Sequence, residues 1–260
     1  MKQRLAQLAA LQRLSLLDLY RRKDMIVVVI LFAVTLVPLA FFAPFGVSGA
    51  SRQMNELALL LVWIFSIAIS MGVTNRLMPP EFDNRTIYPL LAKPVSRGTI
   101  LFGKYLGAVT ASLSALALFY LGYALLAGFR EHFWFPEVLL QAFILHAAFV
   151  LLLCAISLMG SLALTPSANW TLTALVGVSM LLFGSRIPAY AASQGAPIRQ
   201  ILQAIDLFAP HLDFFDMRLR VVHHWPGISW ALCAFLVFYS AAYSALCLFI
   251  ASRLFRRKAI

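Results

Sequence analysis

The chain has 260 residues, of which 62% are hydrophobic and 12% are charged, and its mean hydropathy is +0.86. Because ordinary soluble domains contain about 25% charged residues, this composition excludes that class and predicts a membrane protein. The net charge of +11 would also suit a nucleic-acid-binding protein, but the basic residues mostly flank apolar runs, so we expect no nucleic-acid partner. The three cysteines lie inside apolar runs without C-x-x-C spacing, which indicates neither a disulfide framework nor a zinc site.

Residues 1–24 form the first predicted unit. Leu5, Leu8 and Leu16 share a helical face opposite Gln3 and Gln7. This spacing predicts an amphipathic helix on the inner membrane surface.

Residues 25–260 form the second predicted unit, with six apolar stretches that are each about long enough to cross a hydrocarbon core of ~30 Å. The first stretch and its 24-residue lead are too long for a signal peptide, so we expect an uncleaved anchor. The sequence therefore predicts an all-α, polytopic membrane protein with six transmembrane helices, at 25–45, 57–76, 100–128, 138–164, 170–187 and 228–252.

The fourth and fifth spans belong to one stretch, Val138 to Ser185, that contains no Asp, Glu, Lys or Arg. One straight helix of that length would measure about 72 Å, more than twice the thickness of the hydrocarbon core. The chain is expected to fold back at TPSAN, where Pro166 breaks the fourth helix and Asn169 can cap the fifth.

The distribution of charge predicts the orientation. Fifteen of the 21 Lys and Arg residues lie at the two termini and between the second and third spans, including Lys104, which we expect to extend toward the interface. The positive-inside rule then places both termini in the cytoplasm.

The outer segment 188–227 contains a further periodic pattern. Ile198, Ile201, Leu202, Ile205 and Phe208 recur at helical spacing between Pro197 and Pro210. We expect a short helix that lies on or dips into the outer leaflet.

The stretch GTILFGKY, Gly98 to Tyr105, is one residue away from the phosphate-binding pattern G-x-x-x-x-G-K-[ST]. Tyr105 replaces the hydroxyl residue that would hold magnesium, and the stretch leads into an apolar span instead of following a buried strand. We therefore interpret it as the start of a cytoplasmic helix and expect no nucleotide or other cofactor in this chain.

The loop 78–97 before it reads MPPEFDNRTIYPLLAKPVSR. Acidic Glu81 and Asp83 follow two prolines, where a helix N-terminus favours negative charge. Ile87, Leu90 and Leu91 have a spacing that gives one apolar face. The loop is compatible with a short cytoplasmic helix that another protein binds, or with an ordinary interfacial turn.

The run RTIYPLLAKPVSRGTILFGKYLG with its acidic lead-in, Glu81 to Gly107, resembles the cytoplasmic loop of ABC type-2 transporter permeases, particularly the branch associated with multi-copper enzyme and nitrous-oxide reductase maturation. The chain departs from that pattern in lacking Gly between Arg85 and Thr86, and in Pro89 and Phe102. The stretch APHLDFF, Ala209 to Phe215, is similar to the Pro-Asn-Leu-x-x-Phe stretch before the last span of these permeases, with His211 in place of Asn.

The resemblance implies that the loop forms a coupling helix seated on a separate cytoplasmic ABC ATPase subunit, which binds ATP and magnesium. It also implies a second permease copy or homologue, a location in the bacterial cytoplasmic (inner) membrane, and an outer segment near the pathway at Phe208, Pro210, His211 and Phe214. The implied coupling residues are polar Glu81, Asp83, Arg85, Lys93 and Arg97 and apolar Ile87, Leu90 and Leu91.

Other residues admit two interpretations. His146, deep in the fourth span, is expected to form hydrogen bonds between helices and not to carry protons. His211, Asp213 and Asp216 have a spacing that a metal could use, but the flanking prolines favour a solvated connection. A membrane scaffold without a pathway and an intramembrane enzyme remain alternatives to the permease.

Overall fold

The computed structural model describes residues 2–21, 23, 26, 29–30, 32–34, 50–79, 96–131, 136–208 and 210–257. Within these residues the protein is helical and contains no strand, as predicted.

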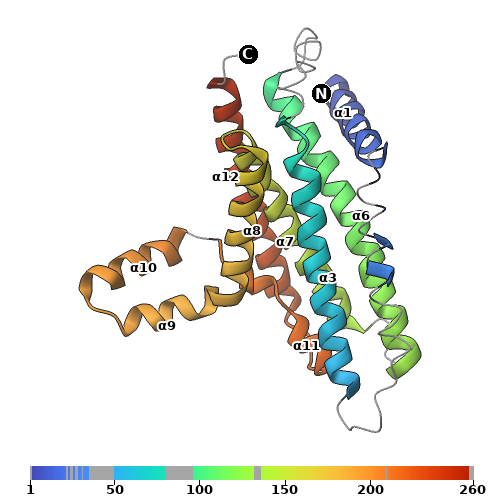
Figure 1. Ribbon diagram of the computed structural model, residues 1–260, viewed down its shortest axis with the longest axis vertical. Coiled ribbons are helices and arrows are strands. Elements are labelled where there is room, and N and C mark those ends of the chain that lie inside the picture. The colour runs from blue at the N-terminus through green and yellow to red at the C-terminus, as the bar shows by residue number, and fades with distance from the viewer. Residues whose placement is uncertain are drawn as a thin grey trace.

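Long helices form an up-and-down bundle (Figure 1). They are α3 (Ala50–Asn75), α6 (Arg97–Glu131), α7 (Glu137–Ser161), α8 (Pro166–Phe183) and α12 (Trp230–Arg257). Four of the described helices, α3, α6, α7 and α12, are long and apolar enough to span a membrane. They overlap the predicted second, third, fourth and sixth spans, whereas the predicted span 25–45 lies mostly outside the described residues.

The helix α1 (Lys2–Arg21) packs along α6, near the end of the bundle where α3 and α12 also finish (Figure 1). We call this end the loop end, because α3 ends and α6 begins there (Figure 1). α1 and the last turn of α12 share this end of the bundle. The predicted number of six crossings stays a prediction, because the described helices include four candidate spans.

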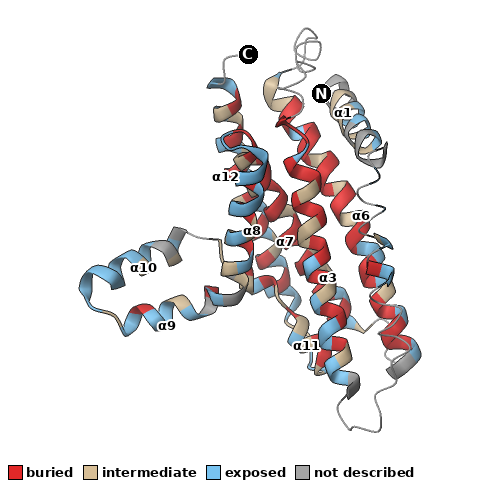
Figure 2. Ribbon diagram, viewed as in Figure 1, coloured by how far each residue is buried: buried red, intermediate tan, exposed pale blue. Residues whose placement is uncertain are grey.

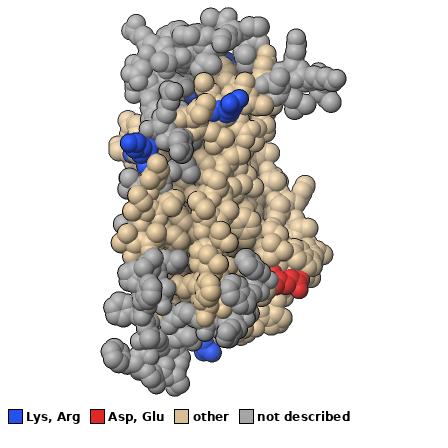
Figure 3. All heavy atoms as spheres, turned by 90° about the vertical axis from the view of Figure 1, so that its right-hand side faces the viewer, with Lys and Arg blue, Asp and Glu red and all other residues tan. Residues whose placement is uncertain are grey.

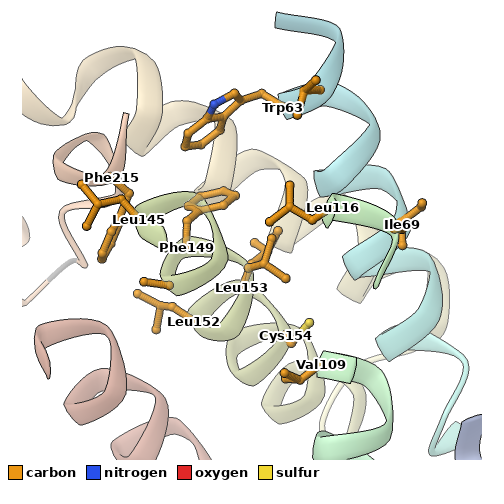
Figure 4. Close-up of a cluster of buried hydrophobic side chains, with 14 of the residues drawn as sticks. Trp63, Ile69, Val109, Leu116, Leu145, Phe149, Leu152, Leu153, Cys154 and Phe215 are labelled. Carbon is orange, nitrogen blue, oxygen red and sulfur yellow. The ribbon is translucent and has the colours of Figure 1, made fainter. Parts of the chain in front are cut away.

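The core of the bundle is apolar and closely packed (Figure 2). Phe119, Phe149 and Phe215 have no exposed surface. Trp63 and Phe149 lie together in the cluster of Figure 4. Large apolar side chains such as Phe238, 72% exposed, cover the outside of α12, which suits a helix whose surroundings are lipid.

The face in Figure 3 shows described basic side chains in its upper half and near its lower end, and an acidic patch at the right in its lower half. A band of uncharged described residues lies between the upper basic side chains and the acidic patch. Such a band is expected where hydrocarbon surrounds the protein.

The predicted fold-back between the fourth and fifth spans is present. α7 ends at Ser161 and α8 begins at Pro166, because proline is favourable in the first turn of a helix, where its missing N–H costs nothing. The prediction that Asn169 caps the helix is wrong, since Asn169 is the fourth residue of α8 and its N–H donates to the Thr165 carbonyl.

A pair of short helices follows α8 and extends to the side of the bundle (Figure 1). They are α9 (Ile187–Ala192), reached through the 3-10 turn η1 (Gly184–Arg186), and the amphipathic α10 (Ala196–Phe208). Ile198 and Ile201 on α10 are exposed.

The chain returns to the bundle through η2 (Leu212–Phe215) and α11 (Arg218–Val222). The expectation of a solvated connection is wrong here, because Leu212 and Phe215 are fully buried and η2 packs on α7 and α8. Apolar side chains spaced three residues apart on a 3-10 turn point the same way, so both enter the bundle.

Candidate functional site

The predicted coupling residues Glu81, Asp83, Arg85, Ile87, Leu90, Leu91 and Lys93 lie outside the described residues. Arg97 is described, and so are both ends of the loop that carries the others. The described contacts at the loop end are those that attach Arg97 and the two ends of this loop to the bundle.

Ser96 caps the helix that leaves the loop. Its hydroxyl accepts a hydrogen bond from the Thr99 N–H at 3.1 Å, and its carbonyl accepts one from the Ile100 N–H at 3.1 Å. A serine in this position satisfies an N–H that has no partner within the helix. The predicted helix start in GTILFGKY is confirmed, since α6 runs without interruption from Arg97.

Lys104 is buried, and its Nζ donates to the Leu77 carbonyl at 3.0 Å. The expectation that it extends toward the interface is wrong. Leu77 is the second residue after the end of α3, close to a helix C-terminus that carries partial negative charge. The ammonium group therefore attaches the beginning of α6 to the end of α3.

Gly103 allows α1 to approach α6 closely. A Cβ atom at this position would lie 2.7 Å from Leu11 Cβ, a distance that only glycine permits. Gly103 therefore serves packing within the chain.

Arg97 points to the last turn of α12. Its Nη1 donates to the carbonyl oxygens of Phe255 at 3.2 Å and Arg256 at 3.3 Å, and its guanidinium carbon lies 5.8 Å from the centroid of the Phe255 ring. A cation at the C-terminus of a helix is electrostatically favourable.

His146 joins three helices in the middle of the bundle. It is fully buried, with Nε2 2.7 Å from the Ser66 hydroxyl on α3 and Nδ1 3.3 Å from the Tyr120 hydroxyl on α6. The indole of Trp63 stacks on its ring at 4.1 Å. The predicted hydrogen bonding between helices is confirmed.

Arg218 connects this cluster to the segment before the last span. Its guanidinium makes a two-pronged ion pair with Asp216, with the shortest contact 2.7 Å, and lies 5.5 Å from the Trp63 ring centroid. A planar guanidinium can hold a carboxylate at its edge while its face rests on an aromatic ring. Sequence reasoning missed Arg218, because nothing local indicates that Trp63 lies nearby.

Among the residues predicted near the pathway, His211 and Phe214 lie together, with their rings stacked at 4.9 Å. The His211 N–H donates to the Tyr239 hydroxyl on α12 at 3.0 Å, and its Nε2 lies 3.2 Å from Asp206 Oδ1. Pro210 precedes them and is partly buried. Phe208 ends α10, and its side chain lies outside the description.

The H-x-D-x-x-D spacing does not assemble as one group. Asp216 faces Arg218, His211 faces Asp206, and Asp213 packs against Gly184, where a Cβ would lie 2.6 Å from its Oδ1. Burial raises the pKa of Asp213, and its Oδ1 is buried without a hydrogen-bond partner. Within the described part of the chain, no group of three or more His, Cys, Asp or Glu is arranged to hold a metal ion.

Two asparagines form a hydrogen-bond network at the loop end. Asn169 Nδ2 donates to Asn75 Oδ1 at 2.7 Å and to the Ser157 carbonyl at 2.9 Å, while Asn75 donates to the Pro166 carbonyl. The space beside Asn169 exists because residue 160 is glycine. This network fixes the turn between α7 and α8 to the end of α3.

Comparison with protein families shows that residues 13–200 match the family described as ABC-2 family transporter protein. The match covers more than half of the chain, including α3, α6, α7 and α8. A comparison with curated proteins found no match.

Proposed function

Because the chain belongs to the ABC-2 transporter family, we propose that it is the transmembrane subunit through which a substrate crosses the bacterial cytoplasmic membrane, driven by ATP hydrolysis in separate partner subunits. The family match over residues 13–200 is the observation that carries this proposal. As a member of this family, the chain is a membrane permease component of an ABC transporter. The likeness of residues 81–107 to the multi-copper enzyme and nitrous-oxide reductase maturation branch extends the proposal to that branch.

The proposed contact with the ATPase is the loop 78–97. Glu81, Asp83, Arg85 and Lys93 would supply its polar contacts, while Ile87, Leu90 and Leu91 would fill a groove of the partner. The attachment of both loop ends supports this role, because Lys104 holds the end of α3 and Ser96 caps α6. If both ends of a loop are held against the bundle, a displacement of the loop also displaces the helices to which it is attached.

The proposed assembly contains two permease chains, either identical or homologous, and two ATPase subunits. ATP and magnesium bind to the ATPase subunits, and this chain contributes no catalytic group. Both termini and the loop face the cytoplasm, with α1 at the inner interface. The common position of α1, the last turn of α12 and the loop ends supports this orientation (Figure 1).

At the opposite face we place α10 against the outer leaflet and Phe208, Pro210, His211 and Phe214 near the pathway. The packing of η2 on α7 and α8 supports this placement, because it brings His211 and Phe214 to the surface of the spanning bundle.

The test is purification of the chain from its native membrane in mild detergent. We expect an ABC ATPase to co-purify, and we expect Glu81→Lys or Arg85→Glu to uncouple ATP turnover from transport without loss of membrane insertion. Repeated purification without an ATPase would favour a membrane scaffold, and unchanged coupling in both variants would exclude the proposed contact surface.

A further inference from the structure

Arg97 is the first residue of α6 and directly follows the serine that ends the loop. Its side chain turns toward α12, where Nη1 donates to the Phe255 and Arg256 carbonyls. It therefore connects two positions that lie 158 and 159 residues apart in the sequence.

The contact is suited to transmit force. The last carbonyl groups of a helix carry partial negative charge, so a guanidinium is electrostatically favourable beside them. Phe255 beneath the guanidinium is fully buried in the core. Arg97 thus holds a point of α12 that is itself fixed to the bundle.

The same part of α6 has two other attachments. Lys104 bonds to the Leu77 carbonyl at the end of α3, and Gly103 touches Leu11 of α1. Of these three attachments, the one made by Arg97 is closest along the chain to residues 80–95 and reaches the last span.

We propose that Arg97 is a positioning residue that passes displacement of the loop 80–95 to α12, instead of one that contacts the ATPase. This inference rests on the proposed function, because the ATPase supplies the displacement. It assigns the last span a direct connection to the loop, in addition to the covalent connections of α3 and α6.

The first measurement uses the full chain alone. Hydrogen–deuterium exchange of the α12 segment that ends at Arg257 should be at least about threefold faster in Arg97→Gln, because local opening follows the loss of a charged hydrogen bond. Arg97→Lys keeps the charge but not the planar donor group, so its exchange rate should lie between those of the wild type and Arg97→Gln. Arg257→Gln is the matched control, since it removes one charge from the same helix end. Wild-type exchange in Arg97→Gln would overturn the proposal.

The second measurement uses the complex with its ATPase. Spin labels on Ala163→Cys, in the exposed turn between α7 and α8, and on Arg256→Cys report movement of α12, while the native cysteines are buried. A non-hydrolysable ATP analogue should change this distance in the wild-type background and in Arg257→Gln. The change should fall by half or more in Arg97→Gln and be partly restored by Arg97→Lys.

The outcomes separate the two proposals. If the ATPase co-purifies and Arg97→Gln shows the full distance change, the transmitting role of Arg97 is wrong while the proposed function stands. If no ATPase co-purifies with any variant, including the wild type, the proposed function fails and the transmitting role fails with it.

Discussion

At the scale of single residues, some buried polar side chains bond to backbone groups at breaks between helices. Gln141 is fully buried, and its amide both donates to the Ile228 carbonyl and accepts from the Ile228 N–H, each at 2.9 Å. Lys104 acts in the same way at the loop end, through its bond to the Leu77 carbonyl. In a hydrocarbon environment unsatisfied backbone groups are expensive, so such side chains allow breaks between helices at membrane depth.

Asp213 is an exception, because its Oδ1 is buried without a partner. Since burial raises the pKa of Asp213 in the folded chain, proton binding favours the fold. The resulting stability is fully present below the ordinary carboxyl pKa of 3.8 and is lost as the pH rises through the raised value. Asp213→Asn should therefore raise the melting temperature at pH 7 by roughly 1–3 °C, and the gain should disappear toward pH 4.

Melting followed by tryptophan fluorescence between pH 4 and pH 8 would measure this effect. Asp216→Asn is the contrasting variant, because it removes the ion-pair partner of Arg218 and should lower the melting temperature at pH 7. An increase in melting temperature for Asp213→Asn that is the same at every pH would show that burial of the charged carboxylate is not its cause.

At the scale of elements, the position of α1 depends on one small residue of α6. Gly103→Ala would place a Cβ 2.7 Å from Leu11 Cβ, so α1 must move and the fold should lose about 1–3 kcal/mol. The same change at Gly98, where the nearest atom is Ser96 Oγ at 4.0 Å, should be neutral or stabilising, because alanine favours a helix.

Thermal unfolding with a thiol-reactive dye would compare the two glycine variants, because Cys154, Cys233 and Cys247 are all buried and react only on unfolding. Equal melting temperatures for Gly103→Ala and Gly98→Ala would show that α1 is not held at this point.

The sequence predicted those elements whose signals are local. Charge-free length and Pro166 indicated the turn between α7 and α8, and apolar periodicity between prolines indicated α10. It did not predict contacts between distant segments, such as Lys104 with Leu77, Asn169 with Asn75, or Arg218 with Trp63. Periodicity shows that a face is apolar, but the partner of a polar residue depends on how helices pack.

The candidate site shows the same difference between features with local signals and contacts between distant segments. The sequence indicated the start of α6, but it did not indicate that the Arg97 guanidinium bonds to α12. The assignment of Arg97 and the loop residues to an ATPase contact stays a prediction. The assignment of His211 and Phe214 to an outer segment near the pathway stays a prediction. The contact of His211 with Tyr239 was missed, because Tyr239 is distant in the chain.

At the scale of the whole molecule, the proposed orientation places the turn between α7 and α8 in the cytoplasm and the turn between α9 and α10 outside. A membrane-impermeant maleimide applied to intact cells should label Ser193→Cys and should label Ala163→Cys only after permeabilisation. Both positions are exposed in the structure, and the native cysteines are buried. The reverse pattern would place the loop 78–97 outside the cell and exclude contact with a cytoplasmic ATPase.

The length of α6 has a consequence for the shape of the protein in its membrane. Thirty-five helical residues extend about 52 Å, while the hydrocarbon core is about 30 Å thick. Unless α6 is strongly tilted relative to the membrane normal, one or both of its ends must extend into water beyond the lipid headgroups. At the end of α6 that carries the Arg97 contact, such an extension would allow a soluble ATPase to bind the chain without contacting the bilayer.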